Sequence, residues 1–345
     1  MKFGILGSGS WGTAIAKILT DNGNVISWWN RSEAAIEQFK IRNHNPQYLT
    51  SARFNVQKLI LSTNVQQVIE QSDVIIIAIP SAYTSEVLLS LNKNIFEGKK
   101  IISAVKGIMP GENELLNDFL AKYFGVKIEN YFALLGPCHA EEVAAEKLSY
   151  LTFTGVDEAT TKIIADNFKT TYINTVVNKD IYGVQYAAVL KNIYAVAAGM
   201  AHGLDYGDNF LSVLIANSAD EMAGFLRKAG IINAEVGYME TDKSTVGKKH
   251  ANYAASVYLG DLLVTCYSLF SRNRTFGNMI GKGYSVKNAQ LEMSMVAEGY
   301  NASKCMHIIN ETVKAEMPIA QTVYDILWNG MDAREGFEKI EAALI

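Results

Sequence analysis

The stretch of the chain with the most chemical information is residues 260–274, which reads Gly-Asp-Leu-Leu-Val-Thr-Cys-Tyr-Ser-Leu-Phe-Ser-Arg-Asn-Arg. If it forms one helix with about 100° per residue, Asp261, Thr265 and Arg272 fall within about 40° of one another. One face would then carry a carboxylate, a hydroxyl and a guanidinium, which suits an anionic ligand that bears hydroxyl groups. By the same count Arg274 lies about 220° from Asp261, so we leave it out of the site. A solvated polar face with a basic end would give the same pattern.

A single lysine stands within a long apolar helix predicted over residues 181–204. Lys191 is the only formal charge of that segment. A helix that is apolar on all sides is usually buried, and a lysine is rarely buried without a partner or a task. Burial would lower its pKa from about 10.4 toward about 7–8, where the amine can give and take protons. Asn192 beside it can donate or accept a hydrogen bond. The alternative is a lysine whose stem packs while its ammonium reaches water.

Residues 7–12 read Gly-Ser-Gly-Ser-Trp-Gly, between a predicted strand and a predicted helix. In dinucleotide-binding folds the first glycine of this pattern permits a tight turn, the second lets the backbone approach a pyrophosphate, and the third allows close packing of the helix. The N-terminus of the helix then offers N–H groups to the phosphates. The pattern in this context predicts a dinucleotide site.

The second predicted strand is followed by Asn30-Arg31, where an NAD-selective site usually has Asp or Glu. Without that carboxylate a 2′-phosphate is not repelled, and Arg31 could pair with it. The sequence therefore favours NADP over NAD. An Arg31 that stacks on the adenine or lies in solvent is the alternative.

Two more segments follow predicted strands, at the sheet edge where doubly wound folds bind ligands. The Lys106 ammonium could polarise a carbonyl or contact a phosphate, although an exposed loop lysine is as consistent with the sequence. Gly136-Pro137-Cys138-His139-Ala140-Glu141-Glu142 enters a helix, where backbone N–H groups bind anions or cofactor amides. Nothing completes a catalytic triad around Cys138, so we do not expect a thiolate nucleophile.

The elements that carry these residues are predicted to form two domains. The first half alternates short β-branched runs with amphipathic stretches, which predicts a doubly wound, parallel, Rossmann-like α/β domain over residues 1–178. Long helical patterns replace the strands after it, so residues 179–345 are predicted to form an all-α, substrate-binding domain. The polar stretch 229–256 is predicted to be a loop or lid. The expected strands are Lys2–Leu6, Val25–Trp29, Val74–Ile79, Lys100–Ala104, Tyr131–Leu135, Tyr150–Thr154 and Thr171–Val176, and the expected helices of the second half span 181–202, 209–228, 252–272, 303–311 and 319–327.

Composition excludes several classes of protein. The 345 residues are 49% hydrophobic and 19% charged with a formal net charge of −4, which favours neither nucleic acid nor an acidic membrane as partner. No run of about 18 apolar residues is present, so we expect no membrane insertion. Three widely spaced cysteines and the lack of a signal-peptide pattern predict a cytoplasmic protein, without a metal cluster or disulfide framework. We also expect a homodimer.

The motifs at 7–13, 103–108, 136–142, 190–192 and 260–274 occur in an order that resembles the bacterial-type NAD(P)-dependent glycerol-3-phosphate dehydrogenases, over most of the chain. The resemblance implies an N-terminal nucleotide domain and a C-terminal helical substrate domain. It implies interconversion of dihydroxyacetone phosphate and sn-glycerol 3-phosphate with NAD(P)H, which supplies glycerol 3-phosphate for phospholipid synthesis. The family often has Ser-Phe where this chain has Cys138-His139, so a contact there would come from a backbone N–H.

The resemblance also implies roles for single residues. Lys191 would accept the proton in the oxidative direction. Substrate contacts would come from Lys106, Gly136, Cys138, Asp261, Ser271, Arg272 and Asn273. Cofactor contacts would come from Ser10, Trp11, Arg31, Lys106, Ala140, Arg272, Val296 and Glu298. To these we add Asn192 as a substrate contact, Lys106, Asp261 and Thr265 as catalytic neighbours of Lys191, and Gly7, Gly9 and Gly12 as cofactor contacts. We expect no metal.

Two other functions stay open. A dehydrogenase of the same layout could act on a different hydroxy acid or keto acid, but it would leave Arg272 and Asn273 without a substrate phosphate to bind. A non-catalytic NAD(P)-binding protein would bind the nucleotide without turnover, and would give no reason for a lysine in the helix over residues 181–204.

Overall fold

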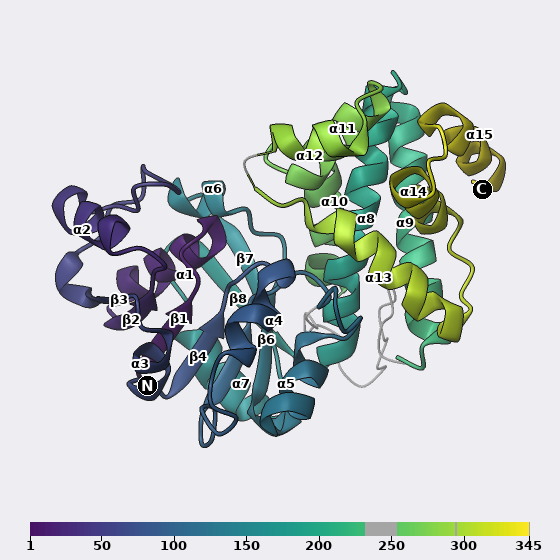
Figure 1. Ribbon diagram of the computed structural model, residues 1–345. Coiled ribbons are helices and arrows are strands. Elements are labelled where there is room, and N and C mark those ends of the chain that lie inside the picture. The colour runs from purple at the N-terminus through teal and green to yellow at the C-terminus, as the bar shows by residue number, and fades with distance from the viewer. Residues whose placement is uncertain (232–253, 294, 345) are drawn as a thin grey trace, which may run out of the picture. The chain divides into compact units, whose positions relative to one another are not determined.

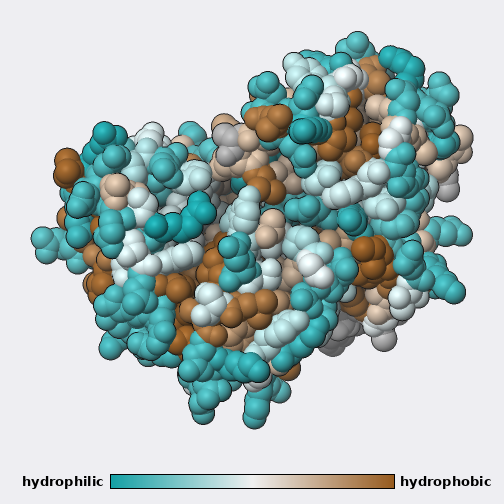
Figure 2. Space-filling view, viewed as in Figure 1, coloured by the Kyte–Doolittle hydropathy of each residue, from teal (hydrophilic) through white to brown (hydrophobic). Residues whose placement is uncertain are grey.

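The computed structural model describes residues 1–231, 254–293 and 295–344, which form two compact units (Figure 1). The first unit contains Met1–Val105 and Glu114–Ile181, and the second contains Lys106–Asn113 and Tyr182–Ile345. Most of the polar stretch 229–256, predicted as a loop or lid, lies outside the described residues. Among the residues described, no helix is both long and apolar enough to cross a membrane. Hydrophilic side chains cover most of the face drawn in Figure 2, with apolar residues in small groups between them.

The first unit is built on an eight-stranded sheet with the order β3-β2-β1-β4-β5-β6-β7-β8. Because the order reverses at β1, the predicted doubly wound architecture is confirmed. All seven expected strands are present, and the sequence reasoning missed only β3, a half-buried strand at the sheet edge. The strands are β1 Phe3–Leu6, β2 Ile26–Trp29, β3 Leu59–Ser62, β4 Val74–Ile77, β5 Lys100–Ser103, β6 Tyr131–Leu135, β7 Ser149–Thr154 and β8 Ile173–Asn178.

The prediction of an entirely parallel sheet is wrong at one place. Strands β1 to β6 are parallel to their neighbours, but β7 runs antiparallel to β6, and β8 is then parallel to β7. The only helix between β6 and β7 is α6, Ala140–Ala144, with 5 residues. A helix of that length rises about 7.5 Å, whereas the five-residue β6 extends about 16 Å. It is therefore too short to return the chain to the start of the sheet, as a parallel crossover requires.

Helices cover this sheet and complete its core. The strand β4 is buried along its whole length, as expected for a central strand with helices on both sides. On β2, next to the edge strand, Trp28 packs edge-on against Phe39 of α2, with ring centroids 5.4 Å apart. The remaining helices of the unit are α1 Ser10–Asp21, α2 Glu33–Arg42, α3 Val65–Glu70, α4 Ser81–Leu89, α5 Leu116–Phe124 and α7 Glu158–Asp166.

From Tyr182 on, every regular element among the described residues of the second unit is a helix, which confirms the prediction of an all-α region. Its centre is α8, a 23-residue helix whose residues Val184 to Ala201 are almost all buried. Helices α11, α12 and α15 were not predicted, and the helix expected over residues 252–272 is interrupted. The helices are α8 Ile181–Gly203, α9 Asp208–Lys228, the π-helix η3 Ala254–Gly260, α10 Asp261–Tyr267, α11 Arg272–Gly281, α12 Val286–Glu292, α13 Glu298–Val313, α14 Pro318–Trp328 and α15 Ala333–Ala343.

A buried carboxylate joins three of these helices. Glu221 of α9 accepts the N–H groups of Ile319 and Ala320, at 2.8 and 2.9 Å, in the first turn of α14. It also accepts the hydroxyl of Tyr194 from α8 at 3.2 Å. Burial raises the pKa of Glu221 to about 7. The carboxyl satisfies donors that the start of α14 would otherwise leave unpaired in the interior, so it fixes α14 against α8 and α9.

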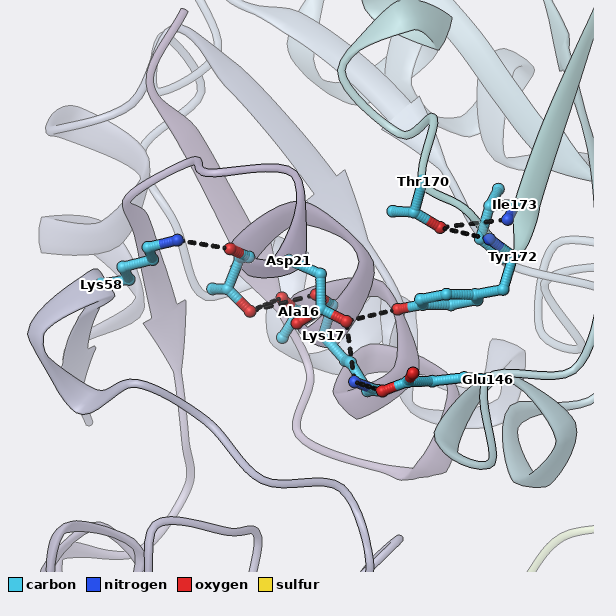
Figure 3. Close-up of polar contacts among 9 residues, drawn as sticks. Ala16, Lys17, Asp21, Lys58, Glu146, Thr170, Tyr172 and Ile173 are labelled. Carbon is cyan, nitrogen blue, oxygen red and sulfur yellow. Dashed lines mark hydrogen bonds and ion pairs between the residues drawn. The ribbon is translucent and has the colours of Figure 1, made fainter.

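In the first unit a buried ammonium joins α1 to the segments that flank β7 (Figure 3). Lys17 is 5% exposed, and its Nζ lies 2.7 Å from Asp21 Oδ2 and 2.9 Å from Glu146 Oε1. The hydroxyl of Tyr172, just before β8, donates to the same Asp21 oxygen at 2.6 Å. Burial and the neighbouring Asp21 carboxylate raise the pKa of Tyr172, so the phenol keeps its proton and remains a donor. This cluster connects the helix behind the glycine loop to the far part of the sheet.

The hydroxyl of Tyr172 should therefore contribute to stability. We expect Tyr172→Phe to lower the free energy of unfolding by about 1–2 kcal/mol, because a hydrogen bond to a partly exposed carboxylate is lost. Urea denaturation followed by circular dichroism measures the change. The control is Tyr150→Phe on β7, whose ring is 43% exposed and which should change the free energy by less than about 0.5 kcal/mol. Equal effects of the two changes would show that the bond to Asp21 contributes nothing.

Candidate active site

The centre of the site in the second unit is a buried ion pair. The Lys191 ammonium, on α8, contacts Oδ1 of Asp261, the first residue of α10. The two side chains are 4% and 2% exposed, so the alternative of a lysine that reaches water is wrong. Asp261 Oδ2 is also buried and has no hydrogen-bond partner among the described residues. The pair therefore offers an ammonium and an unused carboxylate oxygen at one point.

The surroundings bring the pKa of Lys191 closer to neutral pH. Burial lowers the pKa of Lys191 to about 8; the Asp261 carboxylate opposes this effect, and the positive charge of Lys106 adds to it. At neutral pH the amine is protonated but close to its midpoint, which is the range in which an acid or base works best. Burial raises the pKa of the neighbouring Cys266 to about 12, so that thiol is no nucleophile.

The helix predicted through residues 260–274 is broken, which corrects the angular argument made from it. α10 ends at Tyr267, and Ser268 has extended backbone with ψ 135°. The hydroxyl of Ser268 accepts the N–H of Phe270 at 3.1 Å, a local bond that competes with helical bonding. A new helix, α11, then begins at Arg272. The computed angles between Asp261 and both Arg272 and Arg274 therefore do not hold, and the reason for setting Arg274 apart is lost.

The predicted residues of this segment lie in different surroundings. Thr265 is buried, and its hydroxyl donates to the backbone oxygen of Asp261 within α10. Ser271 is buried as the N-cap of α11, where it accepts the N–H of Arg274 at 3.3 Å. Arg272 is exposed. An exposed guanidinium beside the start of a helix can meet an incoming anion, whereas the Thr265 hydroxyl bonds the backbone of Asp261 and the Ser271 hydroxyl caps α11.

A chain of hydrogen bonds between amides connects four segments of the second unit. Asn192 Nδ2 donates to the backbone oxygen of Lys106 at 2.8 Å, and Asn273 Nδ2 donates to Asn192 Oδ1 at 2.8 Å. Asn273 Oδ1 in turn accepts the N–H of Gly299 at 2.9 Å. We call these four residues the amide chain. Each carboxamide nitrogen has two hydrogens and uses one of them among the described residues, which leaves one N–H for a ligand oxygen.

The glycine loop of the first unit has the geometry that a dinucleotide requires. Gly7 has φ +118°, and a Cβ on Gly12 would lie 2.2 Å from the oxygen of Gly7, so both positions exclude larger residues. Gly9 is the N-cap of α1 and has open space where its Cβ would be. The loop thus leaves open space beside the start of α1, where the sequence predicts a pyrophosphate. Ser10 and Trp11 form the first turn of that helix.

Two side chains that were not predicted as site residues bond to this loop. Trp28 Nε1 donates to the oxygen of Gly7 at 2.9 Å. Asn45 Nδ2 donates to the oxygen of Ser8 at 2.9 Å and to Thr13 Oγ1 at 2.8 Å. Both come from segments distant in sequence, and no local pattern marks either of them.

The other candidates divide between the two units. Arg31 is exposed just after β2 and the buried Asn30. Gly136 has φ +118° and a Cβ there would lie 2.9 Å from the Tyr150 oxygen, so this junction also needs glycine. Cys138 and Ala140 are buried near the start of α6 in the first unit, while Val296 and Glu298 lie at the start of α13 in the second. The described residues contain no group of His, Cys, Asp or Glu that could hold a metal ion.

Comparison with known proteins decides the family. The family model for the N-terminus of NAD-dependent glycerol-3-phosphate dehydrogenase matches residues 2–161, and the model for its C-terminus matches residues 180–338. The chain belongs to the NAD-dependent glycerol-3-phosphate dehydrogenase family. The two matches together cover both the glycine loop and the buried ion pair.

Relatives of this glycerol-3-phosphate dehydrogenase family are similar over nearly the whole chain. A curated NAD(P)+ glycerol-3-phosphate dehydrogenase of Macrococcus caseolyticus is 30% identical over 341 residues, which are 99% of this chain and 97% of the relative. One of Bacillus anthracis is 31% identical over 97% of this chain and 93% of its own length. The crystal structure of glycerol-3-phosphate dehydrogenase from Coxiella burnetii has a TM-score of 0.84 at 26% identity and covers 98% of both chains.

The charges of Asp261 and Lys106 act on the pKa of Lys191 in opposite directions, so removing each charge should shift that pKa in opposite directions. Asp261→Asn removes the charge that raises the pKa of Lys191, so the lysine should titrate below about 8. Lys106→Met removes a charge that lowers it, so the lysine should titrate higher. Heteronuclear NMR of the lysine side chains across pH 6–11 measures both shifts. Shifts of the same sign would contradict the geometry of this site.

Proposed function

We propose that this chain interconverts dihydroxyacetone phosphate and sn-glycerol 3-phosphate with NAD(P)H. The observation that supports this function best is the buried Lys191–Asp261 pair, in a chain whose two halves both match this dehydrogenase family. Reduction of a ketone needs a proton for the new alkoxide, and Lys191 is a buried acid whose pKa lies near 8. The bound nicotinamide supplies the hydride.

In the reductive direction Lys191 gives its proton to the carbonyl oxygen, and in the oxidative direction the neutral amine takes a proton from the substrate hydroxyl. Asp261 holds the ammonium in place, and Thr265 supports the backbone of Asp261. The positive charge of Lys106 stabilises the developing alkoxide. The substrate is bound by Lys106, Asp261, the free N–H groups of Asn192 and Asn273, the start of α11 at Ser271 and Arg272, and the backbone at Gly136 and Cys138.

The dinucleotide is held by residues that fit its phosphates and its amide. The open turn at Gly7, Gly9 and Gly12 and the start of α1 would receive the pyrophosphate. Arg31 would pair with a 2′-phosphate, so we propose a preference for NADP over NAD. Further contacts come from Ser10, Trp11, Lys106, Ala140, Arg272, Val296 and Glu298. We assign most dinucleotide contacts to residues 1–178 and most substrate contacts to residues 179–345.

The cellular role follows from the same reaction. We propose that the enzyme works in the cytoplasm as a homodimer and supplies glycerol 3-phosphate for phospholipid synthesis. Size-exclusion chromatography with light scattering tests the dimer, and a mass near 38.0 kDa, that of one chain, would refute it.

The assignment of Lys191 makes a direct prediction. Lys191→Met should lower kcat for dihydroxyacetone phosphate about 100- to 10,000-fold, because the proton donor is lost, while NADPH binding is retained. Absorbance at the NADPH band measures turnover, and fluorescence titration measures binding. Lys282→Met, which changes an exposed lysine after α11, is the control and should keep wild-type turnover.

Removal of Lys191 alone leaves Asp261 buried without a counter-charge, which could unfold the protein. The double change Lys191→Met with Asp261→Asn removes both charges and should be folded and equally inactive. A folded double variant with wild-type turnover would refute the role of Lys191. If the wild-type enzyme turns over unphosphorylated dihydroxyacetone as fast as dihydroxyacetone phosphate, the result would favour a dehydrogenase for a different substrate.

The assignment of Arg31 predicts a change in coenzyme preference. Arg31→Ala should raise KM for NADPH about 10-fold, the cost of one charge-assisted hydrogen bond to a phosphate, and leave KM for NADH within about twofold. Steady-state kinetics with each coenzyme measures the ratio, and NADH serves as the control within the same variant. Equal changes in both KM values would show that Arg31 does not recognise the 2′-phosphate.

A further inference from the structure

The residue at the centre of the amide chain is Asn273. The residue is 8% exposed, and its carboxamide donates to Asn192 on α8 and accepts from Gly299 in the first turn of α13. Both ends of the group are therefore engaged with protein. A carboxamide held at both ends has one orientation, and it transmits that orientation to the group it contacts.

Asn192 passes this constraint on to the segment that carries Lys106. Its Nδ2 donates to the Lys106 backbone oxygen at 2.8 Å, and its Oδ1 is occupied by Asn273. If Asn273 released Oδ1, the carboxamide of Asn192 could rotate about its last torsion and lose the bond to Lys106. The 106–113 segment belongs to the second unit together with α8, so this bond joins parts of one compact body.

Close contacts between helix backbones hold the amide chain closed. A Cβ on Gly277 of α11 would lie 2.0 Å from the Val196 oxygen on α8, and one on Gly199 of α8 would lie 2.1 Å from the Arg274 oxygen on α11. A Cβ on Gly299 would lie 2.5 Å from the oxygen of Asn192 itself. These glycines let α11 and α13 approach α8 closely enough for the two side-chain amides to meet.

We propose that Asn273 is a positioning residue, which acts through Asn192 to hold the segment bearing Lys106 beside Lys191, and that Gly277 and Gly299 are the glycines that keep this chain closed. The inference rests on the proposed function for its kinetic part only. The charged and titratable groups that act on Lys191 are Asp261 and Cys266, both from α10, and Lys106. Of these, only Lys106 is held by the amide chain.

A double-mutant cycle tests the order of action. Asn273→Ala should raise the titration midpoint of Lys191 toward that of Lys106→Met, because the Lys106 charge is no longer held nearby. The same change should lower kcat about 10-fold, the usual effect of losing one hydrogen bond that positions a reacting group. In an Asn192→Ala background, Asn273→Ala should produce no further change in either quantity.

A direct substrate contact alone would give a different result. If Asn273 acts only by touching the substrate, Asn273→Ala raises KM and leaves the titration midpoint of Lys191 unchanged. The fold-changes caused by Asn273→Ala and Asn192→Ala then multiply in the double variant. That outcome overturns the proposal. The midpoint is measured by NMR without substrate, so it decides the positioning role even if the wild-type enzyme fails to turn over dihydroxyacetone phosphate, a failure that would refute only the proposed function.

The glycines are tested against a matched control. Gly277→Ala and Gly299→Ala should raise the Lys191 midpoint and lower kcat as Asn273→Ala does. Gly224→Ala, inside α9, introduces a Cβ that meets no atom of the described residues within 4 Å and should leave both quantities unchanged. Folded glycine variants with wild-type midpoints and kcat would refute their part of the proposal. If they do not fold, the cycle with Asn273→Ala still decides, because that truncation introduces no clash.

Discussion

The constraint on which the second unit depends is the burial of two opposite charges at one point of an apolar helix. Removing an ammonium and a carboxylate from water costs several kcal/mol for each ion, and their attraction offsets this only if the geometry is fixed. Lys191 and Asp261 lie on different helices, so α8 and α10 must hold their relative position closely. The pair is costly for stability and useful for chemistry, since burial brings the pKa of the lysine to about 8.

Much of the surrounding packing limits the movement of α8 and the helices next to it. Glycines bring backbones of α8 and α11 into direct contact, where larger residues would keep the helices apart. Glu221 fixes α14 against α8 through two backbone N–H groups and the Tyr194 hydroxyl, one turn from Lys191. Such contacts leave little freedom, because backbone atoms cannot change rotamer as side chains do. A rigid frame is what allows a buried charge to keep its partner.

What the sequence could reveal depended on the range of the interactions. The glycine loop and Lys191 stand out locally, the first by spacing and the second as a charge in an apolar helix, and the structure places each as expected. The break at Ser268 was missed because serine hydroxyls bond the backbone there, a competition that helical periodicity does not show. The antiparallel β7 was missed because strand direction depends on the connection rather than on the strand. The partners of Asn192 lie 81 and 86 residues away, beyond any local pattern.

Binding a pyrophosphate requires only a local motif, whereas adjusting the pKa of a buried lysine requires contacts between distant segments. A pyrophosphate presents the same charged group to every protein that binds it, so a backbone turn and a helix start suffice, and both are encoded within six residues. A proton donor must instead have its pKa adjusted by several charges in three dimensions. Asp261, Lys106 and the apolar wall around Lys191 come from separate segments, and only the folded chain brings their effects together. The proposed reacting centre is therefore a property of the packing, and its most informative sequence signal is a residue whose polarity conflicts with its surroundings.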